Sequence, residues 1–319
     1  MSKDALELQG TGGRADSAFH WLVRGAAAMV LVVLALVAIT MSTRSADILG
    51  EMGLSFFTSR RWSAADGLHG ALPFLWGTLY TAIIAITLAV PVSLGVALFI
   101  TQVAPPWLKR PMVYVLDLLA VVPSVVFGLW GVMVLAGELR EVYVAVHRAV
   151  GWIPVLGDLF GPNAQGRSFM TAGVILAIMI TPIITSLSRE VIETTPPGEK
   201  EAALALGATR WEMIRASVFP HSKGGLVGAV MLGLGRAMGE TIAAALVIGS
   251  ALGQTTINAF ASGNSMPAVI ANEWGEADNL HKSALVALAM TLFLLTILIN
   301  LAASRIVRRS VARSRGLST

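Results

Sequence analysis

Two opposite charges lie close together inside an apolar stretch of the sequence. Arg236 and Glu240 are four residues apart, so a helix would place them on one face. Because each charge would cost about 2.5 to 3.5 kcal/mol in the middle of a membrane helix, both must face protein or water. The planar guanidinium suits an oxyanion, and the carboxylate can hold the guanidinium or accept a hydrogen bond from a protonated anion. The pair favours a functional site, and Arg236 would bind the solute if the solute is an anion; the alternative is a self-neutralising pair that only fixes helix packing.

A second candidate site is the polar segment 188–223, which is too polar for lipid and too regular to be disordered. Thr195-Pro196 predicts an N-cap followed by the first residue of a helix. Gly207 is able to take the positive φ that ends such a helix, and the residues from Thr209 to Glu212 form a capping box. We expect a helix-turn-helix whose second helix ends at Pro220.

This hairpin could read DNA or serve as a lever for a cytoplasmic partner. Its two ends are tethered to membrane helices, and it carries Glu199, Glu201 and Glu212, so it approaches DNA poorly. Small alanines such as Ala202 and Ala203 permit close packing on another protein. The sequence favours the lever, and a hairpin packed only on itself is the alternative.

Several kinds of chemistry are excluded by residues that the sequence lacks. There is no cysteine, so thiol catalysis and cysteine-bound metals are excluded. The five histidines form no His-Glu-x-x-His pair, and none of the five lysines follows a glycine, as a phosphate-binding loop requires. We expect no catalytic residue, no metal and no cofactor on this chain, so any ATP and magnesium would bind to a separate ATPase.

The elements that position these residues are apolar helices. The chain has 319 residues, a mean hydropathy of +0.73 and only 13% charged residues. About 20 apolar residues cross ~30 Å of hydrocarbon. We therefore predict an all-α membrane protein with six transmembrane helices, at Leu22–Met41, Ala71–Val103, Met112–Ala136, Phe169–Leu187, Gly225–Leu252 and Ser283–Ile306.

Basic residues indicate the orientation of these helices. Apart from Arg236, 15 Lys and Arg residues fall on one side of the predicted membrane and 7 on the other. Because basic residues near helix ends stay in the cytoplasm, both termini are predicted to be cytoplasmic. The pI near 9.8 reflects these flanking charges, and no soluble basic face with interleaved aromatics indicates nucleic acid.

The predicted organisation has three parts. Residues 1–18 are expected to form a cytoplasmic tail, 19–306 a transmembrane domain that includes loop 188–223, and 307–319 a basic cytoplasmic tail. In the outer loop Glu138–Val150, apolar residues recur every three or four positions, which predicts a short surface helix. Such a helix could receive an extracellular binding protein or simply lie at the interface with membrane lipid.

The polar loop also resembles a known family. Glu201-Ala202-Ala203, Gly207 and Pro220 have the spacing of the signature loop of ABC importer permeases, although Ser217 stands where that family usually has isoleucine. The segments AVVPSVVFGLWG and LGLGRAMGETIA look like those of phosphate importer permeases. The long first outer loop, Arg44–Gly70, favours a PstC-type over a PstA-type permease.

This resemblance implies a type I ABC importer permease fold and specific residue roles. Arg236 and Glu240 would take part in phosphate passage. The coupling helix that docks on the ATPase would correspond to the segment from Glu199 to Arg215, with the residues Glu199, Glu201, Ala202, Ala203, Gly207, Arg210 and Arg215.

The resemblance also implies partners and a location. We expect a PstA-like permease, a PstB-like ATPase dimer and an extracytoplasmic phosphate-binding protein, all at the bacterial plasma (inner) membrane. The chain would itself be a non-catalytic, multi-pass subunit of the importer. The alternative is a stand-alone secondary transporter or channel for an anion, with Arg236, Glu240 and Asp117 as an ion relay.

Overall fold

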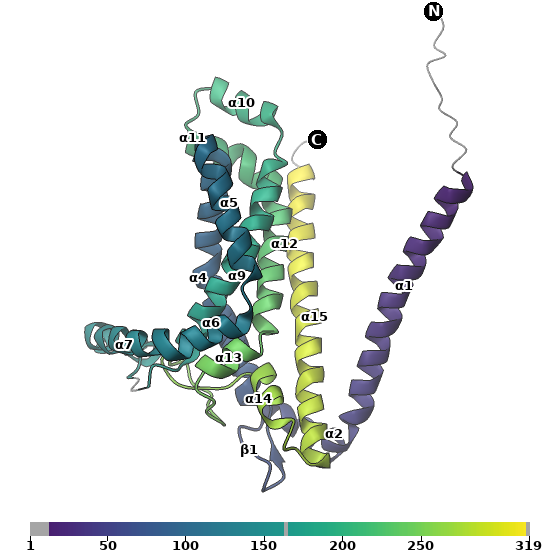
Figure 1. The fold of residues 1–319 in the computed structure, drawn as a ribbon, viewed down its shortest axis with the longest axis vertical. Coiled ribbons are helices and arrows are strands. Elements are labelled where there is room, and N and C mark those ends of the chain that lie inside the picture. Colours follow the sequence, from purple (N-terminus) through teal and green to yellow (C-terminus); the bar gives the residue numbers. More distant parts are fainter. Residues whose placement is uncertain (1–12, 163–164, 317–319) are drawn as a thin grey trace, which may run out of the picture.

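The computed structural model describes residues 13–162 and 165–316, and almost all of its regular structure is helical. Its longest helices form a bundle, except that α1 diverges from it (Figure 1). They are α1 (Gly13–Arg44), α4 (Leu72–Leu98), α5 (Pro106–Val121), α9 (Phe169–Glu193), α12 (Phe219–Met238) and α15 (Asn279–Gly316).

Four helices are long and apolar enough to cross a membrane on their own, at Asp16–Arg44, Leu72–Val103, Phe169–Glu193 and Asn279–Arg305. The second of these joins α4 to the π-helical turn η1 (Phe99–Val103). The tail predicted for residues 1–18 falls partly outside the described residues, and from Gly13 onward the chain is already helical.

The centre of the core is the packing of α4 on α9 and of α9 on α12. Ser168 caps α9 by accepting a hydrogen bond from the Thr171 amide at 3.1 Å. Gly173 brings α9 against α4, because a Cβ there would lie 2.3 Å from Ile84 Cγ2. Apolar side chains such as Ile175 and Ile180 fill the space between the helices.

The stretch Met112–Ala136 differs from the single helix expected, because it is bent. It contains the end of α5, then α6 (Ser124–Trp130) and η2 (Gly131–Leu135), and continues into α7 (Ala136–Val150). Pro123 lacks an amide proton and holds Val122 in an extended conformation, so α5 ends there. The two halves meet at 88°, and α7 runs sideways from the bundle (Figure 1). Counted as one span, this bent pair is a fifth crossing.

The stretch Gly225–Leu252 is also interrupted, which is a second difference from the six continuous helices expected. Helix α12 ends at Met238, and the short helix α13 (Ile242–Val247) begins after a break at residues 239–241. Helix α13 packs on α6, where Gly128 allows contact because a Cβ would lie 2.8 Å from the Ala243 Cα.

The ends of the bundle carry smaller elements. The end where α15 begins holds a two-stranded hairpin, with Trp62 paired to His69, and further short helices. These elements are α2 (Ala46–Met52), α3 (Ser55–Thr58), β1 (Trp62–Ser63), β2 (Leu68–His69) and α14 (Met266–Glu273). Helix α8 (Pro154–Leu159) packs on α7. The opposite end holds α10 (Pro197–Ala205), α11 (Arg210–Met213) and η3 (Ile214–Val218).

Candidate functional site

Arg236 and Glu240 lie together, as the sequence predicted, but at a helix end rather than in the middle of a helix. Arg236 Nη2 is 3.8 Å from Glu240 Oε2. The Glu240 carboxylate is 5% exposed, whereas the Arg236 side chain is 49% exposed. The acid is therefore the fixed partner, and the guanidinium keeps a free face.

The break between α12 and α13 positions the acid. Helix α12, which carries Arg236, ends at Met238. Glu240 therefore lies beyond the C-terminal end of that helix. Its Oε1 accepts a hydrogen bond from the Ala243 amide at 3.3 Å, in the first turn of α13. Because the first amides of a helix lack partners within the helix, the carboxylate satisfies one of them and is held in place.

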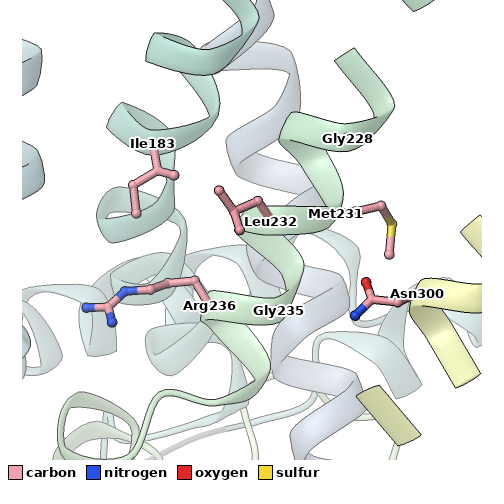
Figure 2. Close-up of a pocket in the computed structure, with 7 residues that line it drawn as sticks. All are labelled: Ile183, Gly228, Met231, Leu232, Gly235, Arg236 and Asn300. Atoms are coloured by element: carbon pink, nitrogen blue, oxygen red, sulfur yellow. The ribbon is translucent and has the colours of Figure 1, made fainter. Parts of the chain in front are cut away.

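A groove with a volume of about 570 Å³ runs along α12 next to the guanidinium. Figure 2 shows Ile183 of α9 on one side of α12 and Asn300 of α15 on the other. The residues that line it are Ile183, Gly228, Met231, Leu232, Gly235, Arg236 and Asn300. A Cβ at Gly228 or Gly235 would meet nothing within 4 Å, so these glycines leave the surface of α12 open.

Asn300 is a groove residue that the sequence analysis missed. It lies 64 positions after Arg236 in the chain, and no motif connects the two. A second hollow, lined by Gly228, Asn300 and Ser304, continues along α12 and α15 toward the end that carries α10. A polar residue within a long apolar run was the available signal, because such residues are costly unless they face protein or water. Asp117 on α5 does not line this groove.

The polar segment after α9 folds as the predicted helix-turn-helix. Gly207 has φ +85° and ends α10, and Thr209 and Glu212 form the capping box at the start of α11. Hydrogen bonds from the Thr209 amide and hydroxyl lower the pKa of the Glu212 carboxyl. The structure corrects two details: α10 begins at Pro197 with Pro196 as its N-cap, and Pro220 does not end the second helix.

The chain continues from α11 through η3 into α12 without a break. Pro220 lies in the first turn of α12, just after the π-helical turn η3, and its missing amide proton removes one backbone hydrogen bond from this continuous helix. Ser217, the departure from the family pattern, donates to the Glu199 carbonyl at 3.2 Å and ties α10 to η3. Glu199 also lies 3.9 Å from His221 Nδ1. The hairpin is therefore braced directly against α12.

The hairpin divides into a packed face and a free face. Met213, Ile214 and Val218 are buried with Ile192 of α9, and Ala203 packs against them. The predicted coupling residues Glu201, Ala202, Gly207, Arg210 and Arg215 are exposed. Leu206 is 90% exposed, and Trp211 is also exposed. The free face thus combines exposed apolar side chains with unpaired charges, which is a composition suited to protein contact.

Within the described part of the chain, no group of three or more His, Cys, Asp or Glu side chains could hold a metal ion. The chemistry that this arrangement supports is recognition of an anion by a half-exposed guanidinium, together with a projecting surface for another protein.

Comparison with known proteins agrees with this class of membrane transport subunit. Residues 89–313 match the model of a family described as binding-protein-dependent transport system inner membrane component. A bacterial alginate ABC transporter, solved with its alginate-bound periplasmic protein, has a similar fold, with a TM-score of 0.61, 15% identity and 93% of this chain and 96% of that chain covered. The MetNI methionine ABC transporter in an inward-facing conformation gives a TM-score of 0.54 at 19% identity, covering 74% of this chain and 93% of that chain.

Relatives with much higher sequence identity show which branch of this family the chain belongs to. PstC, a phosphate transport system permease protein of Mesorhizobium japonicum, is 42% identical over 301 residues, which are 94% of this chain and 92% of the relative. PstC of Xylella fastidiosa is 39% identical over 305 residues, with 95% and 93% covered. PstC 2 of Mycobacterium tuberculosis is 39% identical, with 92% of each chain covered. The chain belongs to this family of inner-membrane transport permeases, in its PstC branch.

Proposed function

We propose that this chain is the transmembrane permease subunit of an ATP-driven importer of inorganic phosphate. Arg236 and Glu240 lie on the phosphate path, and the segment Glu199–Arg215 couples the permease to a separate ATPase. The similarity to PstC phosphate permeases over more than nine-tenths of the chain supports phosphate as the solute.

The observation that carries the phosphate path is the contrast in exposure between the two charges. A buried carboxylate holds one side of the Arg236 guanidinium, and the other side faces an open groove. A guanidinium presents donors in a plane that matches two oxygens of a phosphate. Since the Glu240 charge already compensates the arginine, a passing anion is bound weakly enough to leave again.

The coupling role rests on how the hairpin joins the bundle. Its free face carries Glu201, Arg210 and the exposed Leu206, and its packed face continues through η3 into α12, which carries Arg236. Movement of the hairpin by an ATPase is thereby transmitted to the helix that lines the groove. A transporter driven only by a gradient would have no use for such a lever.

The orientation follows from the arrangement of the chain ends. The N-terminal end of α1 and the C-terminal end of α15 lie at the end of the bundle that carries α10 and α11 (Figure 1). With the basic residues of these segments in the cytoplasm, the hairpin faces the ATPase, and β1 and β2 face outward.

The proposed assembly contains a second, PstA-like permease, two copies of a PstB-like ATPase and an extracytoplasmic phosphate-binding protein. ATP and magnesium bind to the ATPase, and this chain catalyses no reaction. Helix α1 stands apart from the bundle and leaves apolar residues such as Leu31 and Ile39 exposed, so it is available to lipid or to the second permease.

The test is phosphate uptake by the reconstituted importer with Arg236→Ala. Losing a charge-assisted hydrogen bond worth about 1.5 to 3 kcal/mol should lower uptake by roughly 10- to 150-fold. Arg236→Lys, which keeps the charge but not the planar donors, should retain an intermediate rate.

Leu232→Ala is the matched control, because Leu232 lines the same groove without a charge. Co-purification of the ATPase should remain normal in all three variants. Normal uptake by Arg236→Ala in an assembled complex would remove the arginine from the path.

A further inference from the structure

A buried chain of hydrogen bonds lies at the end of the molecule opposite α10 and α11. His69 Nε2 is 2.9 Å from His281 Nδ1, and His281 Nε2 is 2.9 Å from Glu273 Oε2. The Trp62 indole donates to the same carboxylate oxygen at 2.8 Å. The chain joins the β1–β2 hairpin to α14 and to the first turn of α15.

The partners of each ring fix where its protons lie. An ionised Glu273 only accepts, so His281 Nε2 carries a proton and His281 Nδ1 is an acceptor. His69 Nε2–H then donates to His281, which leaves a lone pair on His69 Nδ1. That nitrogen is buried and has no hydrogen-bond partner. With both rings neutral, every contact along the chain is therefore satisfied except at this one atom.

Aromatic rings cover the two imidazoles. His69 is 1% exposed and His281 is 4% exposed. The Trp62 ring lies 5.2 Å from the His69 ring and 4.8 Å from Phe74 at the start of α4. A proton added to His69 Nδ1 would place a charge on a buried ring, with the Gly67 backbone as an acceptor. Adding this charge costs free energy in the folded state, because burial favours the neutral ring.

The surroundings of His69 also disfavour its protonated form. Burial, and next the electrostatic effect of the neighbouring His281 ring, lower the pKa of His69 below its ordinary value of 6.5. The Gly67 backbone and the carboxylates of Asp278 and Glu273 act in the opposite direction without reversing the shift. Glu276, from the turn after α14, lines the same hollow as His281.

The direction of the shift fixes the pH dependence. Because His69 binds a proton less readily in the folded chain than in the unfolded one, its contribution to stability is complete above pH 6.5. It is lost progressively as the pH falls from 6.5 through the lowered pKa. Acid therefore weakens the attachment of the hairpin.

We propose that Trp62, Glu273, His281 and His69 form a proton-sensitive latch, which holds the β1–β2 hairpin on α14 and α15 while the His69 imidazole is neutral and releases it on acidification. In the orientation proposed above, the latch responds to the extracytoplasmic pH.

Release would act on two membrane helices at once. The hairpin leads directly into α4 through Ala71, and His281 lies in the first turn of α15. Trp62 belongs to the apolar cluster that includes Phe74 of α4 and Leu285 of α15. When the latch opens, Trp62 leaves this cluster, and the packing between α4 and α15 loosens at this end.

The test is a distance measurement between spin labels in the full chain in lipid nanodiscs. The protein has no cysteine, so Ala65→Cys and Gly275→Cys introduce unique labelling sites, and both positions are exposed. A single short distance is expected above pH 6.5, with loss of that population and longer distances as the pH falls below this value. The measurement needs no phosphate, ATPase or defined sidedness, so its outcome is independent of the proposed import function.

Variants assign the response to the latch. His69→Gln keeps a donor toward His281 but does not titrate, so the short distance should persist at low pH. His147→Gln is the matched control, because His147 lies on α7 outside the cluster, and it should respond like the unmodified chain. An unchanged distance in the unmodified chain across this pH range would overturn the latch, as would a full response in the His69→Gln, His281→Gln double variant.

Discussion

Glu240 shows how a buried carboxylate is held at the end of a helix. A buried carboxylate costs several kcal/mol unless it is paired, and here the Arg236 guanidinium and the Ala243 amide offset this cost. Removing the acid would leave the guanidinium without its fixed partner and the first turn of α13 without its acceptor. The pairing is therefore needed to hold the guanidinium at the groove.

Asn300 is the residue that tests whether anions use this groove. Asn300→Asp places a second carboxylate beside the groove, and like-charge repulsion should lower phosphate uptake by about tenfold or more, mainly through a higher KM. Asn300→Ser remains neutral and should stay within about twofold of the unmodified importer. Equal uptake by the two variants, measured with labelled phosphate, would show that the anion passes elsewhere.

The hairpin of α10 and α11 is the element in which local sequence rules are clearest. Gly207 has a positive φ that a residue with a Cβ adopts only with strain, and the Thr209 capping box begins the next helix immediately. Each signal depends on residues that lie within about four positions of one another, so neither signal requires contact with the membrane. The element is held in one shape before any partner binds.

Gly207→Ala should weaken this turn by about 1 kcal/mol, since an L-residue pays roughly that to enter the left-handed region. Amide hydrogen exchange over residues 197–213 should become about fivefold faster at neutral pH. Gly198→Ala is the control on the same helix, because its added Cβ meets nothing within 4 Å and its φ is not positive. Equal exchange rates in the two variants would argue against a strained turn.

At the scale of the whole molecule, two exposed apolar surfaces differ in their surroundings. One is the free face of the hairpin, with Leu206 and Trp211, and the other is the outer surface of the membrane spans, including the span Asp16–Arg44. A hairpin outside the membrane gains nothing from exposing these side chains to water. Docking of the proposed ATPase would cover this hairpin surface.

Leu206→Ala combined with Trp211→Ala should reduce co-purification of the ATPase with the permease by about tenfold or more, since anchoring side chains of this kind dominate interface energies. Leu54→Ala is the control, because Leu54 is equally apolar and exposed but lies at the opposite end of the bundle. Unchanged ATPase recovery from the double variant would place the docking surface elsewhere.

The sequence by itself determined the helical membrane class, the charge pair, and the turn and capping box of the hairpin. These features depend on interactions within about four residues or on the total apolar length of a segment. The helix signals near Thr195 and Pro220 were misplaced, because proline fits both at the start of a helix and after its end.

Only the tertiary structure decided where the two broken stretches bend and which distant residues meet. Glycine tolerates both a straight helix and a break, so the end of α12 before Glu240 depends on the packing of α13 against Gly128 of α6. Asn300 reaches the groove, and His69 meets His281 from 212 positions away, because helices from different parts of the chain pack side by side. Such contacts leave no periodic trace in the sequence, since each partner is selected by a surface that exists only after folding.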